Sequence, residues 1–264
     1  MDKPRALVLT GFGVNADKEL GHAFLMAGAE PRVAHINDLI CGKLKLGEFQ
    51  ILAFPGGFSF GDDLGSGRVF ANKFKYGLSG QMERFLEDGK LVIGICNGFQ
   101  VLVKMGLLPA CGKKYFQQTA TLAFNDSGKF EDRWCYLKAN PNSPCVFTKG
   151  ISTLYVPVRH GEGKFIPGSE ETRRMLHENG QVALQYCDAA GNVDGSYPLN
   201  PNGSVDSIAG ICDETGRIFG LMPHPEAHLF GLNNPRWARE GLAGEEGAGL
   251  KIFRNCVEFA KKSI

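Results

Sequence analysis

Short runs of consecutive apolar residues alternate with amphipathic stretches in the first hundred residues of the chain. The apolar runs cover residues 5–10, 51–54 and 91–95, and residues 31–36 read as a further short strand. Unbroken runs of this length are typical of strands buried on both faces of a sheet. Helical spacing follows the first run and precedes the last one, at residues 82–86. This alternation predicts a mostly parallel central sheet flanked by helices, an α/β fold.

The pattern changes after about residue 112, where short strand candidates are separated by clusters of turn residues. The candidates are 121–124, 134–138, 182–187, 208–212 and 218–222. Their closer spacing predicts a smaller antiparallel sheet beside the parallel one. An amphipathic helix is expected at residues 249–262. Because no repeat or flexible linker interrupts the chain, we expect residues 1–264 to form a single domain.

Composition narrows the classes of function. Hydrophobic residues make up 43% of the chain, charged residues 22%, and the net charge is +1. These are ordinary globular proportions without the basic excess of a nucleic-acid or membrane-surface protein, so neither partner is expected. The chain shows neither a signal peptide nor a membrane-spanning apolar run. Its eight cysteines lack CxxC spacing, which predicts reduced thiols in a cytoplasmic protein and no metal site.

One cysteine lies in a pattern that carries chemistry. Gly94, Cys96 and Gly98 have the spacing of a nucleophile elbow, in which a buried strand turns sharply into a helix. Glycine two residues before and two after the nucleophile avoids a clash of Cβ atoms at the tight turn. The helix N-terminus favours the thiolate, which is the reactive form of cysteine. We therefore expect Cys96 to be a catalytic nucleophile.

A thiol nucleophile needs a base, and the best placed of the six histidines is His224. It follows the last strand candidate and stands between two prolines, which predicts an extended backbone there. In an extended segment residues i and i+2 project to the same side, so Glu226 is expected to orient the His224 ring. His228 is an alternative base, but no carboxylate lies two residues beyond it.

Attack on an amide carbon creates an oxyanion that needs N–H donors already in place. One candidate is the backbone N–H of Asn97, directly after the nucleophile. The second is the glycine turn after the third strand candidate, which centres on Gly57. An ordinary tight turn would explain those glycines equally well if they stood alone.

Four segments in this order, FPGGFSFGD, GICNGFQ, RHGEGKF and MPHPE, resemble the class I glutamine amidotransferases. More closely, the chain is similar to the glutaminase subunits and domains of phosphoribosylformylglycinamidine synthase. The resemblance covers nearly the whole chain, including NDSGKFEDRW, NPNGS and the C-terminal IFRN. It implies a flavodoxin-like fold. It departs at Ala227, where many relatives carry arginine, and in the stretch 228–248.

The resemblance also implies roles for individual residues. Cys96 would form a glutamyl thioester within a triad, and two N–H groups would bind the oxyanion. Four further residues would line the glutamine pocket, and His160 is not expected to be the base. The implied assignments are Cys96, His224 and Glu226 for the triad, Gly57 and Asn97 for the oxyanion, and Gln100, Phe58, His160 and Gly161 for the substrate.

The function implied by the resemblance is hydrolysis of L-glutamine to glutamate and ammonia. The ammonia would pass to a synthetase subunit, assisted by a small accessory subunit, in de novo purine biosynthesis. The chain lacks a P-loop and a complete dinucleotide fingerprint, so no cofactor is expected here and ATP and Mg²⁺ would serve the synthetase. The alternatives are a stand-alone γ-glutamyl cysteine hydrolase and a catalytically silent binding subunit.

Overall fold

The apolar runs of the first hundred residues form the parallel half of a nine-stranded sheet in the computed structural model, which describes residues 3–264. The strand order in this half is β2-β1-β3-β4-β11, the order of flavodoxin-like folds. Every residue of β3, β4 and β11 is buried. The bounds are β1 (Arg5–Thr10), β2 (Glu30–His35), β3 (Ile51–Phe54), β4 (Leu91–Ile95) and β11 (Ile218–Leu221).

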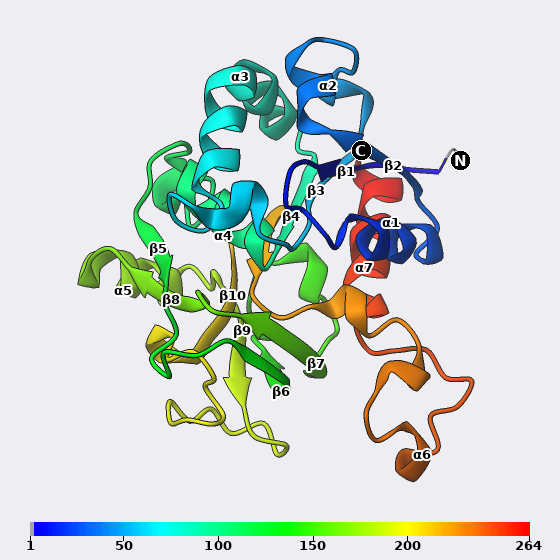
Figure 1. Cartoon of the computed structure of the whole chain (residues 1–264), viewed down its shortest axis with the longest axis vertical. Coiled ribbons are helices and arrows are strands. Elements are labelled where there is room, and N and C mark those ends of the chain that lie inside the picture. Colours follow the sequence, from blue (N-terminus) through cyan, green and yellow to red (C-terminus); the bar gives the residue numbers. More distant parts are fainter. Residues whose placement is uncertain (1–2) are drawn as a thin grey trace.

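The second half of the chain continues the same sheet with antiparallel strands in the order β10-β9-β6-β7 (Figure 1). These are β6 (Glu131–Ala139), β7 (Thr153–His160), β9 (Val182–Cys187) and β10 (Ile208–Cys212). A separate two-stranded antiparallel sheet joins β5 (Ala120–Ala123) to β8 (Lys164–Pro167). The predicted fold class is confirmed, although neither β7 nor β8 was expected from the sequence.

Helices cover both faces of the parallel half (Figure 1). On one face α1 packs against α7, where the rings of Phe24 and Phe253 meet edge-to-face with their centres 5.3 Å apart. On the other face α3 packs against α4. The helices are α1 (Asp17–Met26), α2 (Ile36–Ile40), α3 (Arg68–Glu87), α4 (Asn97–Met105), α5 (Glu170–Glu178), α6 (Trp237–Glu240) and α7 (Leu250–Ser263).

Single 3₁₀ turns join several of these elements. They are η1 (Leu46–Glu48), η2 (Ser59–Asp62), η3 (Cys111–Lys113), η4 (Val146–Thr148), η5 (Val205–Ser207), η6 (Pro225–Ala227) and η7 (Gly231–Asn233). Between η6 and α7 the chain makes an excursion that carries α6 away from the main body, drawn in orange in Figure 1. A bridge between Phe230 and Glu246 closes its base.

The topology brings the candidate residues to one edge of the sheet. Strands β3, β4 and β11 run parallel, so their carboxyl ends lie side by side. The glycine turn follows β3, Cys96 follows β4, and the segment with His224 follows β11. Ligands in open α/β sheets bind beyond the carboxyl ends of the strands, and the candidate site lies there.

Candidate functional site

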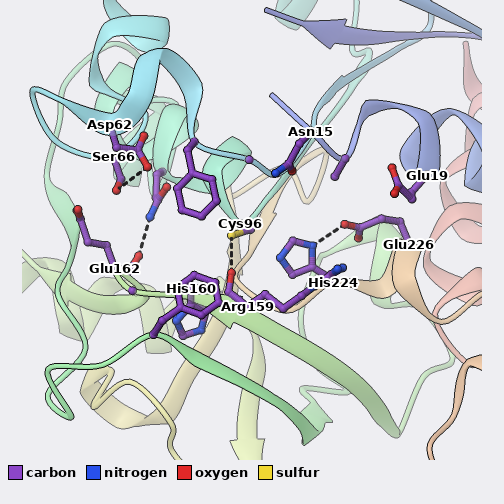
Figure 2. A pocket seen from close by; sticks show the side chains of 16 residues that line it. Asn15, Glu19, Asp62, Ser66, Cys96, Arg159, His160, Glu162, His224 and Glu226 are labelled. Atoms are coloured by element: carbon purple, nitrogen blue, oxygen red, sulfur yellow. Dashed lines mark hydrogen bonds and ion pairs between the residues drawn. The ribbon is translucent and has the colours of Figure 1, made fainter. Parts of the chain in front are cut away.

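A cavity of about 340 Å³ opens beyond the ends of β3, β4 and β11 (Figure 2). All nine residues predicted for the site lie in or directly beside it. The lining residues are Asn15, Ala16, Glu19, Gly57, Phe58, Asp62, Ser66, Cys96, Gln100, Phe130, Arg159, His160, Gly161, Glu162, His224 and Glu226. Asn97 contributes from behind, as the first residue of α4.

The nucleophile stands on the sharp turn that the glycine spacing predicts. Cys96 has a left-handed φ of 53° and directly precedes α4. A Cβ on Gly98 would lie 1.9 Å from the carbonyl oxygen of Phe54, and one on Gly94 would lie 2.6 Å from that of Gly98. Both positions therefore exclude any larger residue, as the elbow geometry requires.

His224 and Glu226 form the pair expected of a base and its orienting carboxylate. His224 Nδ1 lies 2.6 Å from Glu226 Oε1, and both residues are buried. Burial by itself would lower the pKa of His224. The charges of Glu226 and of Cys96 in its thiolate form outweigh that effect and raise the pKa to about 10. The raised pKa favours the imidazolium form of His224 when Cys96 is a thiolate.

The backbone around this pair differs from the prediction. Residues 225–227 form the 3₁₀ turn η6 rather than an extended segment, so the expected extended geometry is wrong. Pro225 begins the turn, where its fixed φ suits a helical start, and the N–H of Ala227 bonds to the carbonyl of His224 at 3.2 Å. The turn nevertheless places the Glu226 carboxylate against the His224 ring.

The Cys96 thiol has a hydrogen-bond partner other than the base. Its sulfur lies 3.6 Å from the carbonyl oxygen of Arg159 in β7, to which it donates. His224 Nε2 is buried and makes no hydrogen bond within residues 3–264. Figure 2 shows the imidazole ring beside the sulfur, with the Arg159 carbonyl on another side of it. The ring nitrogen is therefore free to exchange a proton with the sulfur or with a leaving group.

Two backbone N–H groups lie free near the sulfur. Gly57 and Val14 form an antiparallel bridge whose hydrogen bonds are made by the flanking residues, Asn15 to Gly56 and Phe58 to Gly13. The Gly57 N–H is therefore left without an acceptor in the described part of the chain. At the first position of α4, the N–H of Asn97 also has no acceptor there. These are the two donors predicted for an oxyanion.

The side chain of Asn97 ties the walls of the cavity together. Its Oδ1 accepts from the N–H of Ser59 at 3.2 Å, while its Nδ2 donates to Asp62 and to Gln100 at 3.1 and 2.9 Å. Gln100 in turn donates to the carbonyl of Glu162 at 2.6 Å. Gln100 thus lies in the predicted pocket. Its amide oxygen accepts one hydrogen bond, from Asn97, and its amide nitrogen donates one, to Glu162.

His160 stands in the cavity wall as a buried, neutral ring. Its Nδ1 lies 3.1 Å from Asn125 Oδ1, and its Nε2 lies 3.5 Å from Asn202 Nδ2. Burial, reinforced by the charge of His224, lowers the pKa of His160 to about 4. With both nitrogens engaged by asparagines, His160 shapes the wall instead of serving as a base. The neighbouring Gly161 accepts from the N–H of Asn125 at 2.9 Å.

Phe58 lies at the mouth of the cavity with 49% of its surface exposed, and its ring centre is 6.4 Å from that of Phe130. The rival base, His228, does not line the cavity. Its Nδ1 lies 2.9 Å from the carbonyl oxygen of Tyr155, to which it donates.

Three charged residues that line the cavity were not predicted from the sequence: Glu19, Asp62 and Arg159. Asp62 has a left-handed φ of 54°, and burial raises its pKa despite hydrogen bonds from Gly67, Asn97 and Ser66. Its place in the GGFSFGD segment, five residues after Gly57, was the available signal. Arg159 directly precedes His160 and could have been found from the RHGEG motif, whose Glu162 also lines the cavity.

Other expectations concern cysteines, metals and membranes. All eight cysteines are free thiols. Within residues 3–264 no group of three or more acidic, histidine or cysteine side chains is arranged to hold a metal ion. Among the helices of the same residues, none combines the length and apolar character needed to cross a bilayer.

Comparisons with known proteins agree with the geometry. Residues 3–260 match the family of the CobB/CobQ-like glutamine amidotransferase domain. The phosphoribosylformylglycinamidine synthase subunit PurQ of Dehalococcoides mccartyi is 52% identical, over 99% of this chain and all of that protein. PurQ of Methanococcus maripaludis is 47% identical over 98% of each chain. A chain in the structure of PurLQS from Thermotoga maritima is 33% identical, with a TM-score of 0.71 over 98% of this chain and 99% of that one.

Proposed function

The chain belongs to the PurQ subunits of phosphoribosylformylglycinamidine synthase, and from that premise we propose that its cavity hydrolyses L-glutamine at Cys96. The products are glutamate and ammonia, and the ammonia is passed to a synthetase subunit for purine biosynthesis. One observation carries this proposal: a thiol and an imidazole–carboxylate pair line a single cavity, with two backbone N–H groups beside the thiol, at Gly57 and Asn97, that are unpaired within residues 3–264.

The first half of the reaction forms a thioester. The Cys96 thiolate attacks the side-chain amide carbon of glutamine, and the carbonyl electrons move onto the oxygen. The N–H groups of Gly57 and Asn97 stabilise that oxyanion. When the carbon–nitrogen bond breaks, protonated His224 gives its proton to the departing nitrogen, which leaves as ammonia.

The second half restores the enzyme. His224, now neutral, takes a proton from a water molecule that attacks the thioester carbon. The same two N–H groups stabilise the second oxyanion, the carbon–sulfur bond breaks, and glutamate leaves. Glu226 holds the ring through Nδ1 and balances its positive charge in both halves, so Nε2 always faces the reacting atoms.

The amino-acid end of glutamine is assigned to the side of the cavity with Asp62, Glu162 and Gln100. Figure 2 shows Asp62 and Glu162 on one side of Cys96, with His224 and Glu226 on the other. The negative charge of Glu162 contributes to the raised pKa of Asp62. An α-ammonium group between the two carboxylates would relieve that repulsion and satisfy both charges.

The mouth of the cavity faces the synthetase in this proposal. Two large apolar side chains that line it are half exposed, Phe58 at 49% and Phe130 at 53%, and Phe12 and Leu64, near Phe58 and Asp62 along the chain, are 67% exposed. A rim of this kind is typical of a surface that a partner covers. The partner would use ATP and Mg²⁺, with a small accessory subunit, and this single glutaminase domain of residues 1–264 would act in the cytoplasm.

The test is synthesis of phosphoribosylformylglycinamidine in the presence of synthetase and accessory subunits, with glutamine or with ammonium chloride as nitrogen donor. We expect the wild-type chain to support both reactions and Cys96→Ser to support only the ammonium-dependent one. Glutamine hydrolysis should also rise when the subunits are added. If Cys96→Ser still supports the glutamine-dependent reaction, or hydrolysis is indifferent to the subunits, the proposal fails.

A further inference from the structure

Strand β7 is the last strand of the nine-stranded sheet and pairs with β6 on one side only. Its outer edge carries parts of the candidate site instead of another strand. Three carbonyls on this edge, those of Tyr155, Pro157 and Arg159, each accept one hydrogen bond. The donors are His228 Nδ1 at 2.9 Å, the backbone N–H of His224 at 2.8 Å and Cys96 Sγ at 3.6 Å.

The spacing of these acceptors follows from strand geometry. Main-chain groups of alternate residues point to the same edge of a strand, so carbonyls 155, 157 and 159 form one row with steps of about 6.6 Å. Proline has no N–H and is tolerated on a free edge, where Pro157 lies. A rigid strand therefore sets the relative positions of the nucleophile, the base and His228.

His228 is held firmly at its end of this row. It is 4% exposed, and its ring meets that of Trp134 edge-to-face at 5.0 Å. A carbonyl can only accept, so Nδ1 carries the hydrogen. Burial lowers the pKa of His228, which keeps the ring neutral near pH 7 despite the opposing effect of the Tyr155 carbonyl.

The turn η6 is thereby fastened to β7 at both ends, through the His224 N–H and the His228 ring. The start of α7 closes its other side. The N–H of Gly249 donates to the carbonyl of His228 at 3.0 Å. A Cβ on Gly249 would lie 2.0 Å from the carbonyl oxygen of Pro225, and one on Gly247 would lie 2.2 Å from that of His228. Glu226 sits inside this clamped turn.

From this arrangement we infer that His228 is a positioning residue for the catalytic pair: its Nδ1–H fastens η6 to Tyr155 and so sets the place of Glu226 and His224 relative to Cys96. Without that bond only the His224 N–H would hold the turn to β7, and the imidazole would drift from the sulfur. Displacements of about 1 Å in such constellations cost roughly 100-fold in rate. The inference deepens the proposed function and rests on it for the role of His224.

The experiment compares His228→Asn with His228→Gln. The amide N–H of asparagine lies about where Nδ1 lies in histidine, while that of glutamine lies one bond further out, so only the first keeps the donor in place. His177→Gln is the control, since His177 is an exposed residue of α5 that pairs with Asp206. The full-length chain is alkylated with iodoacetamide across a pH series, and the adduct on Cys96 is followed by mass spectrometry.

We expect His228→Gln to react about 10- to 100-fold more slowly at pH 7, with its pH profile displaced to higher pH and its high-pH plateau unchanged. His228→Asn and His177→Gln should follow the wild type. In steady-state glutamine hydrolysis His228→Gln should lower kcat and leave KM unchanged, because His228 does not line the cavity.

Coincident profiles for the asparagine and glutamine variants, whether both resemble the wild type or both are displaced, would overturn the inference. Iodoacetamide reports on the thiol without glutamine. Separated profiles in a chain that does not hydrolyse glutamine would therefore sink the proposed function alone, and hydrolysis with coincident profiles would sink this inference alone.

Discussion

The thiol of Cys96 donates its hydrogen bond to the main-chain carbonyl of Arg159, while the free ring nitrogen of His224 faces the same sulfur. The carbonyl can only hold the proton-bearing thiol, whereas protonated His224 favours the thiolate. The sulfur thus has two neighbours: the Arg159 carbonyl, which suits the thiol, and protonated His224, which suits the thiolate.

Replacement of the sulfur by oxygen should abolish glutamine hydrolysis. Serine fits the elbow, but its hydroxyl is far less acidic than a thiol, so we expect Cys96→Ser to lose more than about 10³-fold in kcat. Glutamate release measures the loss, and labelling by diazo-oxo-norleucine should disappear with it. Cys41→Ser, at an exposed thiol, is the control and should retain both signals. Labelling that survives in Cys96→Ser would place the nucleophile elsewhere.

The oxyanion turn should not tolerate a side chain. Gly57 has a φ of 143°, and a Cβ there would lie 2.6 Å from the carbonyl oxygen of Gly13. In Gly57→Ala the turn must shift and one N–H donor moves, which should lower kcat about 10²- to 10³-fold. Alkylation of Cys96 by iodoacetamide forms no oxyanion and should stay normal.

Gly47→Ala provides the matched control for this substitution, because its Cβ would meet nothing within 4 Å and its φ lies outside the left-handed region. Stability and kcat of that variant should equal those of the wild type. A Gly57→Ala protein with unchanged kcat would remove Gly57 from the oxyanion site.

Asp62 should select for the α-ammonium group of the substrate. Asparagine tolerates the left-handed backbone at this position, so Asp62→Asn removes the charge with little strain. Loss of one charge-assisted hydrogen bond predicts a rise of about tenfold or more in KM for L-glutamine. Glutaramate, which lacks the amino group, should be hydrolysed equally well by both proteins. If Asp62→Asn raises KM equally for L-glutamine and glutaramate, Asp62 does not bind the α-ammonium group.

His160 should make the protein sensitive to acid. The unfolded chain binds a proton at this ring below about pH 6.5, but the buried ring binds one only near a pKa of about 4. The free energy of unfolding should therefore decrease by about 3 kcal/mol as pH falls through this window, because of this ring alone. Above about pH 6.5 the ring should have no effect on the free energy of unfolding. Urea unfolding at pH 7 and pH 4.5 measures the decrease.

His160→Gln lacks the titrating ring, so its loss of stability between those two pH values should be smaller than that of the wild type by about 2 to 3 kcal/mol. The comparison removes the contribution of the carboxylates, which titrate in both proteins. An identical decrease in both would show that the ring is protonated as readily in the folded chain as in the unfolded one.

The elements that sequence predicted well have local causes. Strands β3 and β4 are unbroken apolar runs, and Gly94 answers a steric demand from Gly98, four residues away. The demand on Gly98 comes from Phe54 at the end of β3, but the spacing of the two glycines around Cys96 is visible in the sequence. The amidotransferase resemblance rests on segments of the same kind, and the comparisons confirm the family. The roles of the triad remain predictions that the geometry supports.

Non-local causes explain what was missed. Strand β7 contains Pro157 and Arg159, which argue against a strand when the sequence is read alone, and it forms because β6 offers a full-length partner. The turn η6 replaces an extended segment because two distant elements, β7 and the start of α7, enclose it. Asp62 and Glu162 come from separate loops, so only the folded chain shows that both line one cavity.

The row of carbonyls on β7 also bears on how this protein avoids self-association. A bare edge strand offers its main-chain groups to strands of other molecules and invites aggregation. Here Cys96, His224 and His228 occupy three outward carbonyls of that edge, so a foreign strand would have to displace these groups to pair with that part of it. The contacts that order the site thereby also cover this edge of the sheet.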